Sequence, residues 1–413
     1  MGIRRLAALG ALLLAPVLPK GLPEGVTPLP REMETRVEQL LHEAETWRGL
    51  KVKEPVPSGS VDDSVLRQKM LESFREELPP EVLRPAETGL KAFGFIPEDL
   101  DLVKFFPELL SSQVAGYYDP ERHYFALVQR EELSLDPDVS DEAKRLMEAV
   151  LVHELTHALQ DQYFHLETFT TNRPLDDADV ARLALVEGDA TLVMIDFFAQ
   201  TSLETMPGSE QMASMLGDPQ QMLGSGVPGA AEMLAAPAWF QDTLLFSYAQ
   251  GFQFCLDVRR KGGQALLDKA FSTDPPRSSE QILHPEKWHT KRDDPVGIAW
   301  PALPLSGWKK VSEGQLGELS VRTLVRDVAK QDQAQAVKAA AGWGGDQFAV
   351  YDKDGRRLLV WISEWDSDAD ARELQGALRG LGRDWAVKRS GKRVVVTRGE
   401  VSRELRAALK KRT

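Results

Sequence analysis

The sequence predicts an α+β protein that is predominantly helical, and three observations lead to this class. Stretches with helical periodicity fill most of the first 260 residues. Two β-prone runs, at residues 113–118 and 123–128, interrupt them. From residue 305 onward, hairpin signals alternate with short helices. We therefore expect a mainly helical domain that contains one hairpin, followed by a small α+β domain at residues 305–413.

Length and composition fit a soluble globular protein of two or three domains. The chain has 413 residues, of which 42% are hydrophobic and 27% charged. Its formal net charge of -13 does not indicate a protein that binds nucleic acid. The single cysteine, Cys255, excludes an intramolecular disulfide and any zinc site built from several cysteines.

Residues 1–20 are typical of a signal peptide or an N-terminal anchor. Arg4 and Arg5 precede an apolar run from Leu6 to Leu18, which is short for a membrane span. We therefore expect an exported protein that is periplasmic, envelope-associated or secreted. Contact with a membrane is expected only through this segment, if it is not cleaved. The alternatives are a wrongly assigned start codon and a buried N-terminal helix.

The chain then divides into a linker and a long helical domain. Residues 21–60 are rich in Pro and Gly at both ends, and we expect a linker with one helix at residues 31–47. Residues 61–304 are expected to form the main domain, which opens with a helix at residues 61–78. We expect the helical pattern to break at Pro79-Pro80, Gly94, Pro97 and Pro107.

The hairpin around Asp119–Arg122 leads into a helix at residues 140–162 that contains His153, Glu154 and His157. Residues i and i+4 share one face of a helix, so both imidazoles can reach one metal ion, and Glu154 lies beside it. Alternatively, the two histidines are surface residues or hydrogen-bonded core groups. The apolar neighbours favour the metal, because buried imidazoles need partners.

A second helix, at residues 177–200, carries a carboxylate within its apolar face. Glu187 lies among apolar neighbours, where an unpaired charge is costly. Gly188 follows it and permits another backbone to approach closely. Glu187 is therefore predicted to be a third metal ligand. The alternative is a buried ion pair between Glu187 and an arginine.

This arrangement resembles the gluzincin metallopeptidases, whose zinc is held by two histidines and a downstream glutamate. The segment His153–Ala158 is similar to that of the thermolysin family, and the resemblance covers residues 110–300. It implies a zincin-like domain with Zn²⁺ on His153, His157 and Glu187, and with Glu154 as general base. Many gluzincins have an aspartate four residues after the glutamate ligand, where this chain has Thr191. Asp189 or Asp161 are candidates to replace it.

The segments after the second helix complete the expected site. Residues 201–237 are expected to form a long loop or short helices that can cover the cleft. A helix at residues 237–258 contains Tyr248-Ala249-Gln250-Gly251, which resembles the Tyr-x-x-Gly segment of gluzincin aminopeptidases. By that match Tyr248 donates a hydrogen bond to the oxyanion; alternatively, it is a core residue. His284 either lines the cleft or caps the short helix that begins near Ser278.

The C-terminal domain shows no catalytic spacing of residues. We expect a helix at residues 325–341, a hairpin of strands at 347–351 and 358–362, and a helix at 366–381. A second hairpin, at residues 385–388 and 393–397, and a helix at 401–411 are expected to follow.

Together these features predict a zinc-dependent peptidase, most simply an endopeptidase, that acts on a peptide or protein substrate outside the cytoplasm. Three protein ligands leave the fourth zinc position for water, as in catalytic sites. One alternative is a catalytically inactive zinc-binding scaffold or partner-binding protein of the envelope. The other is a metal hydrolase that acts on a non-peptide amide.

Overall fold

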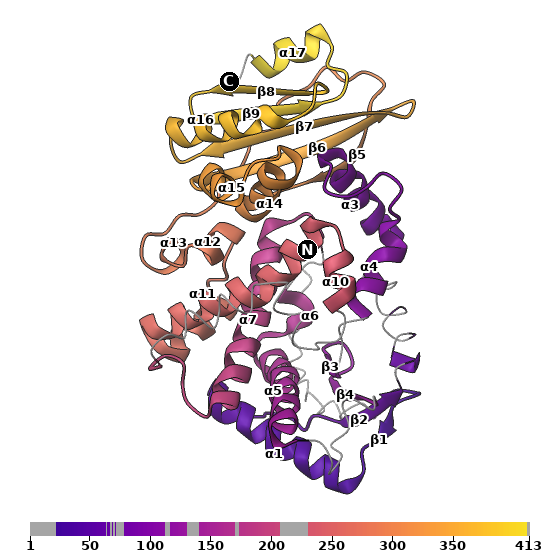
Figure 1. Cartoon of the computed structure of the whole chain (residues 1–413), viewed down its shortest axis with the longest axis vertical. Coiled ribbons are helices and arrows are strands. Elements are labelled where there is room, and N and C mark those ends of the chain that lie inside the picture. The colour runs from indigo at the N-terminus through magenta and orange to yellow at the C-terminus, as the bar shows by residue number, and fades with distance from the viewer. Residues whose placement is uncertain are drawn as a thin grey trace, which may run out of the picture.

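The computed structural model describes residues 22–410, apart from residues 63, 67, 69–70, 72–77, 112–115, 130–139, 170–172 and 207–229. The expected signal segment at residues 1–20 and most of the loop at 201–237 lie outside the described residues. The structure is α+β, as predicted, and has two sheets. Figure 1 shows long helices in the middle of the molecule, the C-terminal sheet at one end and a small sheet towards the other. In the described ranges no helix is long and apolar enough to cross a membrane.

The small sheet has the strand order β1–β2–β4–β3, so that β3 is an edge strand. Its members are β1 Thr27–Pro28, β2 Ser58–Asp62, β3 Gly116–Asp119 and β4 Tyr124–Gln129. The antiparallel pairing of β3 with β4 confirms the predicted hairpin. The parallel strand β2 corrects the prediction of a linker up to residue 60 and a helix from Val61. Its short run has no alternation of apolar and polar residues, and Gly59 lets β1 approach closely.

The long helices are α1 Arg31–Arg48, α5 Asp141–Phe164, α7 Asp177–Ala199 and α11 Ala238–Phe271. Helices α5, α7 and α11 lie in the middle of the molecule, and α1 lies at the end opposite the C-terminal sheet (Figure 1). They confirm the helices predicted at 31–47, 140–162 and 177–200. The fourth is longer than its prediction of 237–258, because it continues past a kink at Gly262 and Gly263. One apolar cluster joins α1 to α5, and another joins α7 to α11. Two short helices, α6 Leu166–Phe169 and α10 Ala230–Ala235, flank this group.

Two helices connect the small sheet to the rest of the fold. Helix α3, Pro80–Phe93, begins after Pro79 and ends at Gly94, whose φ of 81° is left-handed. Helix α4, Leu102–Ser111, contains Pro107, although a break was predicted there. Proline removes one backbone hydrogen bond from a helix. The helix nevertheless continues and buries Leu109 in the core.

The C-terminal sheet has the strand order β5–β6–β7–β9–β8. Its strands are β5 Lys309–Gly314, β6 Trp343–Lys353, β7 Arg356–Trp365, β8 Trp385–Ser390 and β9 Arg393–Arg398. The pairings β6–β7 and β8–β9 confirm both predicted hairpins. The helices that accompany this sheet are α14 Gly317–Thr323, α15 Gln333–Ala340, α16 Asp368–Ala377 and α17 Arg403–Lys410. Two short helices, α12 Ser279–Leu283 and α13 Glu286–His289, precede them and pack in the cluster of α7 and α11.

The helix predicted at residues 325–341 is interrupted at residues 329–332. Residues 324–328 form a π-helical turn that continues α14, and α15 begins only at Gln333. Two local features cause the break. Lys330 has a left-handed φ of 59°, and the Asp332 side chain accepts a hydrogen bond from the Gln335 N–H.

The C-terminal sheet shares its core with helix α3. Leu83, Leu90 and Phe93 of α3 belong to the same buried cluster as Phe348 and Trp361 of the sheet. The ring of Phe93 meets the edges of both aromatic rings, at centroid distances of 5.0 and 6.0 Å. Thus α3, which precedes α5 and α7 in the sequence, completes the core of the C-terminal domain.

Candidate metal centre

Helices α5 and α7 bring the three predicted ligands together. His153 and His157 lie one turn apart on α5, with their Nε2 atoms 3.1 Å apart. On α7, Glu187 places Oε2 3.2 Å from the Nε2 of His153 and 3.6 Å from that of His157. The three side chains are largely buried, with exposed fractions of 9%, 13% and 18%. They form a group that can hold one metal ion.

The spacing of these three atoms fits a tetrahedral ion. Zinc binds imidazole nitrogen and carboxylate oxygen at about 2.0–2.2 Å, which gives a tetrahedron with edges of roughly 3.3–3.5 Å. The three measured separations are 3.1, 3.2 and 3.6 Å. Two imidazoles and one carboxylate are also a donor set that suits zinc and leaves a coordination position for a substrate or water.

Two glycines bring Glu187 against the helix that carries Tyr248. A Cβ at Gly188 would overlap the backbone of Gly251, and a Cβ at Gly251 would overlap the carbonyl group of Ala184. The backbones of α7 and α11 therefore touch, without side chains between them. Gly251 is the glycine of the Tyr-x-x-Gly segment, and Gly188 directly follows the predicted ligand.

A buried chain of hydrogen bonds orients His157. Its Nδ1–H donates to Gln160 Oε1 over 2.8 Å, because the Gln160 amide nitrogen already donates to Asp189 Oδ2 and to the Val186 carbonyl. Asp189 in turn accepts from Arg48 Nε over 2.6 Å. This arrangement puts the proton of neutral His157 on Nδ1 and leaves the Nε2 lone pair facing the ligand group.

Asp189 and Asp161 were the two candidates to replace the aspartate that this chain lacks at position 191, and they have different partners. Asp189 supports His157 through Gln160, whereas Asp161 accepts from the Tyr118 hydroxyl over 2.9 Å and lies 2.8 Å from the Nδ1 of His123. The Nδ1 of His153 and the hydroxyl of Thr191 are both buried without a hydrogen-bond partner among the described residues.

His157 and Glu187 shift the pKa values of each other's side chains. Burial opposes the charge on His157, but the attraction of Glu187 outweighs it and raises the pKa of His157 to about 9. Burial likewise opposes ionisation of Glu187, and the two imidazoles outweigh it and lower the pKa of that carboxyl. The ionised carboxylate of Glu187 thus favours positive charge beside the imidazoles. A divalent cation can supply that charge.

Glu154 lies at the same site but is not one of the three predicted ligands, His153, His157 and Glu187, which we call the ligand group. Burial raises the pKa of its carboxyl, and the attraction of His157 and His153 opposes the rise. Its Oε2 accepts a hydrogen bond from the Tyr118 N–H over 3.3 Å. Tyr118 belongs to β3, the edge strand that packs beside α5. Among the described residues no strand pairs with the other edge of β3, so Glu154 is hydrogen-bonded to an edge strand of the sheet.

Tyr248 of α11 also reaches the site. Its ring centroid lies 6.1 Å from that of His153, and 41% of its surface is exposed. The negative charge of Glu187, which accepts a hydrogen bond from the Tyr248 hydroxyl, raises the pKa of Tyr248 well above its usual value, and burial adds to the effect. The hydroxyl is thus a neutral donor beside the ligand group.

Other polar groups that the sequence singles out have local partners. His284 lies 3.1 Å from Glu318 and stands at the C-cap position of α12, at the opposite end of the helix from its N-cap, Ser278. A second acidic group, formed by Glu280, Asp293 and Asp366, surrounds the Lys287 ammonium at 2.7–3.0 Å. The lysine satisfies these carboxylates, so this cluster is an ion-pair network rather than a metal site.

Sequence reasoning missed Gln160 and Arg48 as parts of the site. Gln160 follows His157 by three residues, a spacing at which side chains meet on a helix, and this spacing could have identified it. Arg48 lies 141 residues before Asp189, and no local pattern connects the two.

Comparison with known proteins gives one match. A domain of unknown function, DUF8575, matches residues 305–413. This range coincides with the C-terminal domain and contains none of the ligand-group residues. No curated protein and no solved structure matches the chain.

Proposed function

We propose that this protein is a zinc-dependent peptidase of the gluzincin type, most simply an endopeptidase, with a zincin-like domain at residues 61–304. The observation that carries the proposal is the convergence of His153, His157 and Glu187 with mutual atom separations of 3.1–3.6 Å. A partly buried carboxylate from the same helix and an edge strand beside it support a catalytic role rather than a structural one.

The three ligands would hold the ion, which supplies a Lewis acid and a water nucleophile at neutral pH. Glu154 takes a proton from the attacking water and delivers it to the leaving amine. Tyr248 donates its hydroxyl hydrogen bond to the oxygen that gains negative charge. The edge of β3 aligns the substrate backbone by strand addition.

The test is cleavage of a mixed peptide library by the full chain with zinc, compared with Glu154→Gln. Loss of a general base typically costs about 10²- to 10⁴-fold in rate, and we expect a loss of this size. Glu148→Gln, on the same helix but paired with Arg36, is the matched control and should cleave normally. Bound zinc is measured in all three proteins by mass spectrometry.

Two results would count against the peptidase. Equal cleavage by the Glu154→Gln variant would remove Glu154 from the chemistry. Bound zinc without any cleavage of peptides would favour the zinc-binding scaffold or a hydrolase of non-peptide amides. The proposed export is tested separately by fractionation of cells that produce the full chain.

A further inference from the structure

Strand β8 forms one edge of the C-terminal sheet, and among the described residues no strand pairs with its outer side. Its pairing with β9 is regular from Trp385 to Ser390. In an antiparallel pair, successive residues turn their backbone N–H and C=O groups alternately towards the partner strand and away from it. Ser390 pairs with Arg393 next to the two-residue turn, so the backbone groups of Val387 and Arg389 face outwards.

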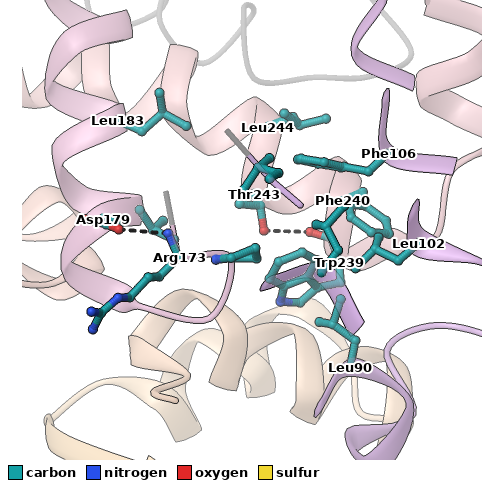
Figure 2. Close-up of a pocket in the computed structure, with 14 residues that line it drawn as sticks. Leu90, Leu102, Phe106, Arg173, Asp179, Leu183, Trp239, Phe240, Thr243 and Leu244 are labelled. Atoms are coloured by element: carbon teal, nitrogen blue, oxygen red, sulfur yellow. Dashed lines mark hydrogen bonds between the residues drawn. The ribbon is translucent and has the colours of Figure 1, made fainter. Parts of the chain in front are cut away.

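The opposite edge of the sheet, strand β5, is built differently. A register irregularity before Ser312 interrupts its pairing with β6, and such bulges protect sheet edges. Helix α3 packs on β5 and β6, because a Cβ at Gly89 would meet the side chains of Ser312 and Phe348. Leu90 of α3 also lines a pocket together with Trp239 of α11 (Figure 2). Figure 1 shows β5 near α3 and β8 on the far side of the sheet, so β8 is the regular edge away from the long helices.

A hollow of about 390 Å³ lies beside β8. Its walls come from β8, from α16 and from the segment that follows α16: Gln375, Leu378, Arg379, Leu381, Trp385 and Val387. Trp385 and Val387 are two residues apart and therefore lie on one face of the sheet, where they pack against the cluster that contains Leu378. A segment added to β8 would point every second side chain towards this face. The hollow can therefore receive an apolar side chain from such a segment.

The surface around β8 is basic, although the chain as a whole is acidic. Residues 379–413 contain twelve Lys and Arg but three Asp and Glu, whereas the net charge of the full chain is -13. Arg379 in the hollow and Arg383, just before β8, are exposed, and neither forms an ion pair with a carboxylate that the structure describes. Arg389, in contrast, is paired with Asp368. The two exposed arginines are thus available to the carboxylates of a partner.

The combination of an open strand edge, a hollow and positive charge selects among the possible partners. Antiparallel pairing of β8 with a second copy of itself would bring Lys388 and Arg389 close to the same cations, and like charges across paired strands are destabilising. Nucleic acid and anionic lipid would match the charge but would not use the outward backbone groups of the strand. An extended acidic polypeptide uses all three features.

We propose that the outer edge of β8 binds an extended acidic segment of another protein by strand addition. The backbone groups of Val387 and Arg389 exchange hydrogen bonds with the segment. One apolar side chain of the segment enters the hollow, and its carboxylates lie next to Arg379 and Arg383. The proposal concerns the C-terminal domain, which contains none of the ligand group, and does not depend on the proposed peptidase function.

The experiment measures binding by fluorescence anisotropy. The probe is the fluorescein-labelled peptide Thr-Glu-Thr-Leu-Thr-Glu-Thr, in which the leucine and both glutamates share one face of a strand. It is titrated with the full chain carrying Glu154→Gln, which keeps the probe intact if the metal centre cleaves peptides. Three matched probes replace both glutamates by lysine, replace the leucine by alanine, or carry N-methyl groups on alternate backbone nitrogens.

Each matched probe removes one feature of the proposed contact: charge, the apolar side chain or the strand hydrogen bonds. We expect each to bind about tenfold or more weakly than the original probe. This comparison needs no further variant of the protein. If the original probe does not bind, or if any matched probe binds as tightly, the proposal is overturned.

A pair of variants then locates the binding surface. Arg379→Glu/Arg383→Glu should weaken the original probe about tenfold or more and should favour the lysine probe instead. Lys309→Glu/Lys310→Glu makes the same change of charge at exposed positions of β5 and should leave binding unchanged. Circular dichroism checks that both variants fold. Equal losses in the two variants, or no loss in either, would overturn the assignment to β8.

Oligothymidylate and vesicles of phosphatidylglycerol test the other two classes of partner at the same salt concentration. Binding of either one that depends on Arg379 and Arg383 and is at least as tight as that of the original probe would overturn the acidic polypeptide. Weaker binding of both supports it.

Discussion

Gly188 packs against the backbone of Gly251 where helix α7 meets helix α11, and neither position has room for a side chain. This contact lies one residue from Glu187 and three from Tyr248. The two helix backbones consequently fix the distance between a predicted ligand and the predicted oxyanion donor. A change at either glycine therefore acts on the fold and on the metal centre together.

We predict that Gly188→Ala and Gly251→Ala lower the free energy of unfolding. Alanine in place of glycine normally stabilises a helix by about 0.5–1 kcal/mol. Here the added methyl group would meet backbone atoms, and overpacking of this kind costs about 1–3 kcal/mol or more. Gly376→Ala in α16, where no atom lies within 4 Å of the added carbon, is the control and should be neutral or stabilising. Urea denaturation measures all three, and a stabilised Gly188→Ala variant would contradict the close contact.

We predict that Gln160→Met weakens zinc binding by about 10- to 100-fold, the usual effect of losing a partner of a metal ligand. The substitution removes the acceptor that holds the Nδ1 proton of His157. The affinity is measured by competition with a chelator. Gln162→Met, on the same helix but bonded to residues 53 and 54, is the control and should bind zinc normally. Unchanged affinity in Gln160→Met would show that Gln160 does not orient His157.

We predict that Arg48→Met destabilises the protein by about 3–5 kcal/mol, because it leaves Asp189 as a buried charge without its partner. The side chains of Arg48 and Asp189 are both 0% exposed and lie 2.6 Å apart. Arg36→Met breaks the more exposed pair with Glu148 and should cost less than about 1 kcal/mol. Thermal and urea unfolding compare the two variants, and similar losses would argue against a special role for Arg48.

We predict that stability falls as the pH rises from about 4 to about 6, in part because of Asp346. Burial raises the pKa of Asp346 to about 6, although the N–H groups of Leu316, Gly317 and Trp343 donate to it. In this pH window the folded protein keeps a proton that the unfolded chain releases, so the stabilisation is lost as pH rises. A shift of about two units corresponds to about 3 kcal/mol. Urea unfolding at several pH values should show a flatter dependence in Asp346→Asn, and an unchanged slope would contradict the shift.

The sequence indicated the elements with strong periodicity and the residues with local spacing. The helices that carry His153 and Glu187 were predicted to within a few residues, because their apolar faces are long. The pairing of His153 with His157 follows from helix geometry alone. Glu187 is far from both histidines in the sequence. Only the cost of burying an unpaired carboxylate indicated that it joins them.

The features that the sequence did not reveal depend on tertiary contacts. Strand β2 lacks an alternating pattern and exists because β1 and β4 flank it. The break before α15 depends on a single left-handed residue, Lys330, that no periodicity marks. Arg48 reaches Asp189 across 141 residues, a relationship that no local rule contains.

The sharing of a core between helix α3 and the C-terminal sheet has a consequence for biosynthesis. Contacts between these regions join residues far apart in the sequence: Arg357 of β7 pairs with Glu98, just after α3, across 259 residues. During synthesis at about 5–20 residues per second, the apolar face of α3 leaves the ribosome many seconds before the sheet that will cover it. The nascent chain must therefore keep that face from aggregating until its last quarter has been made. A chain cut at residue 304 would carry the same exposed face permanently.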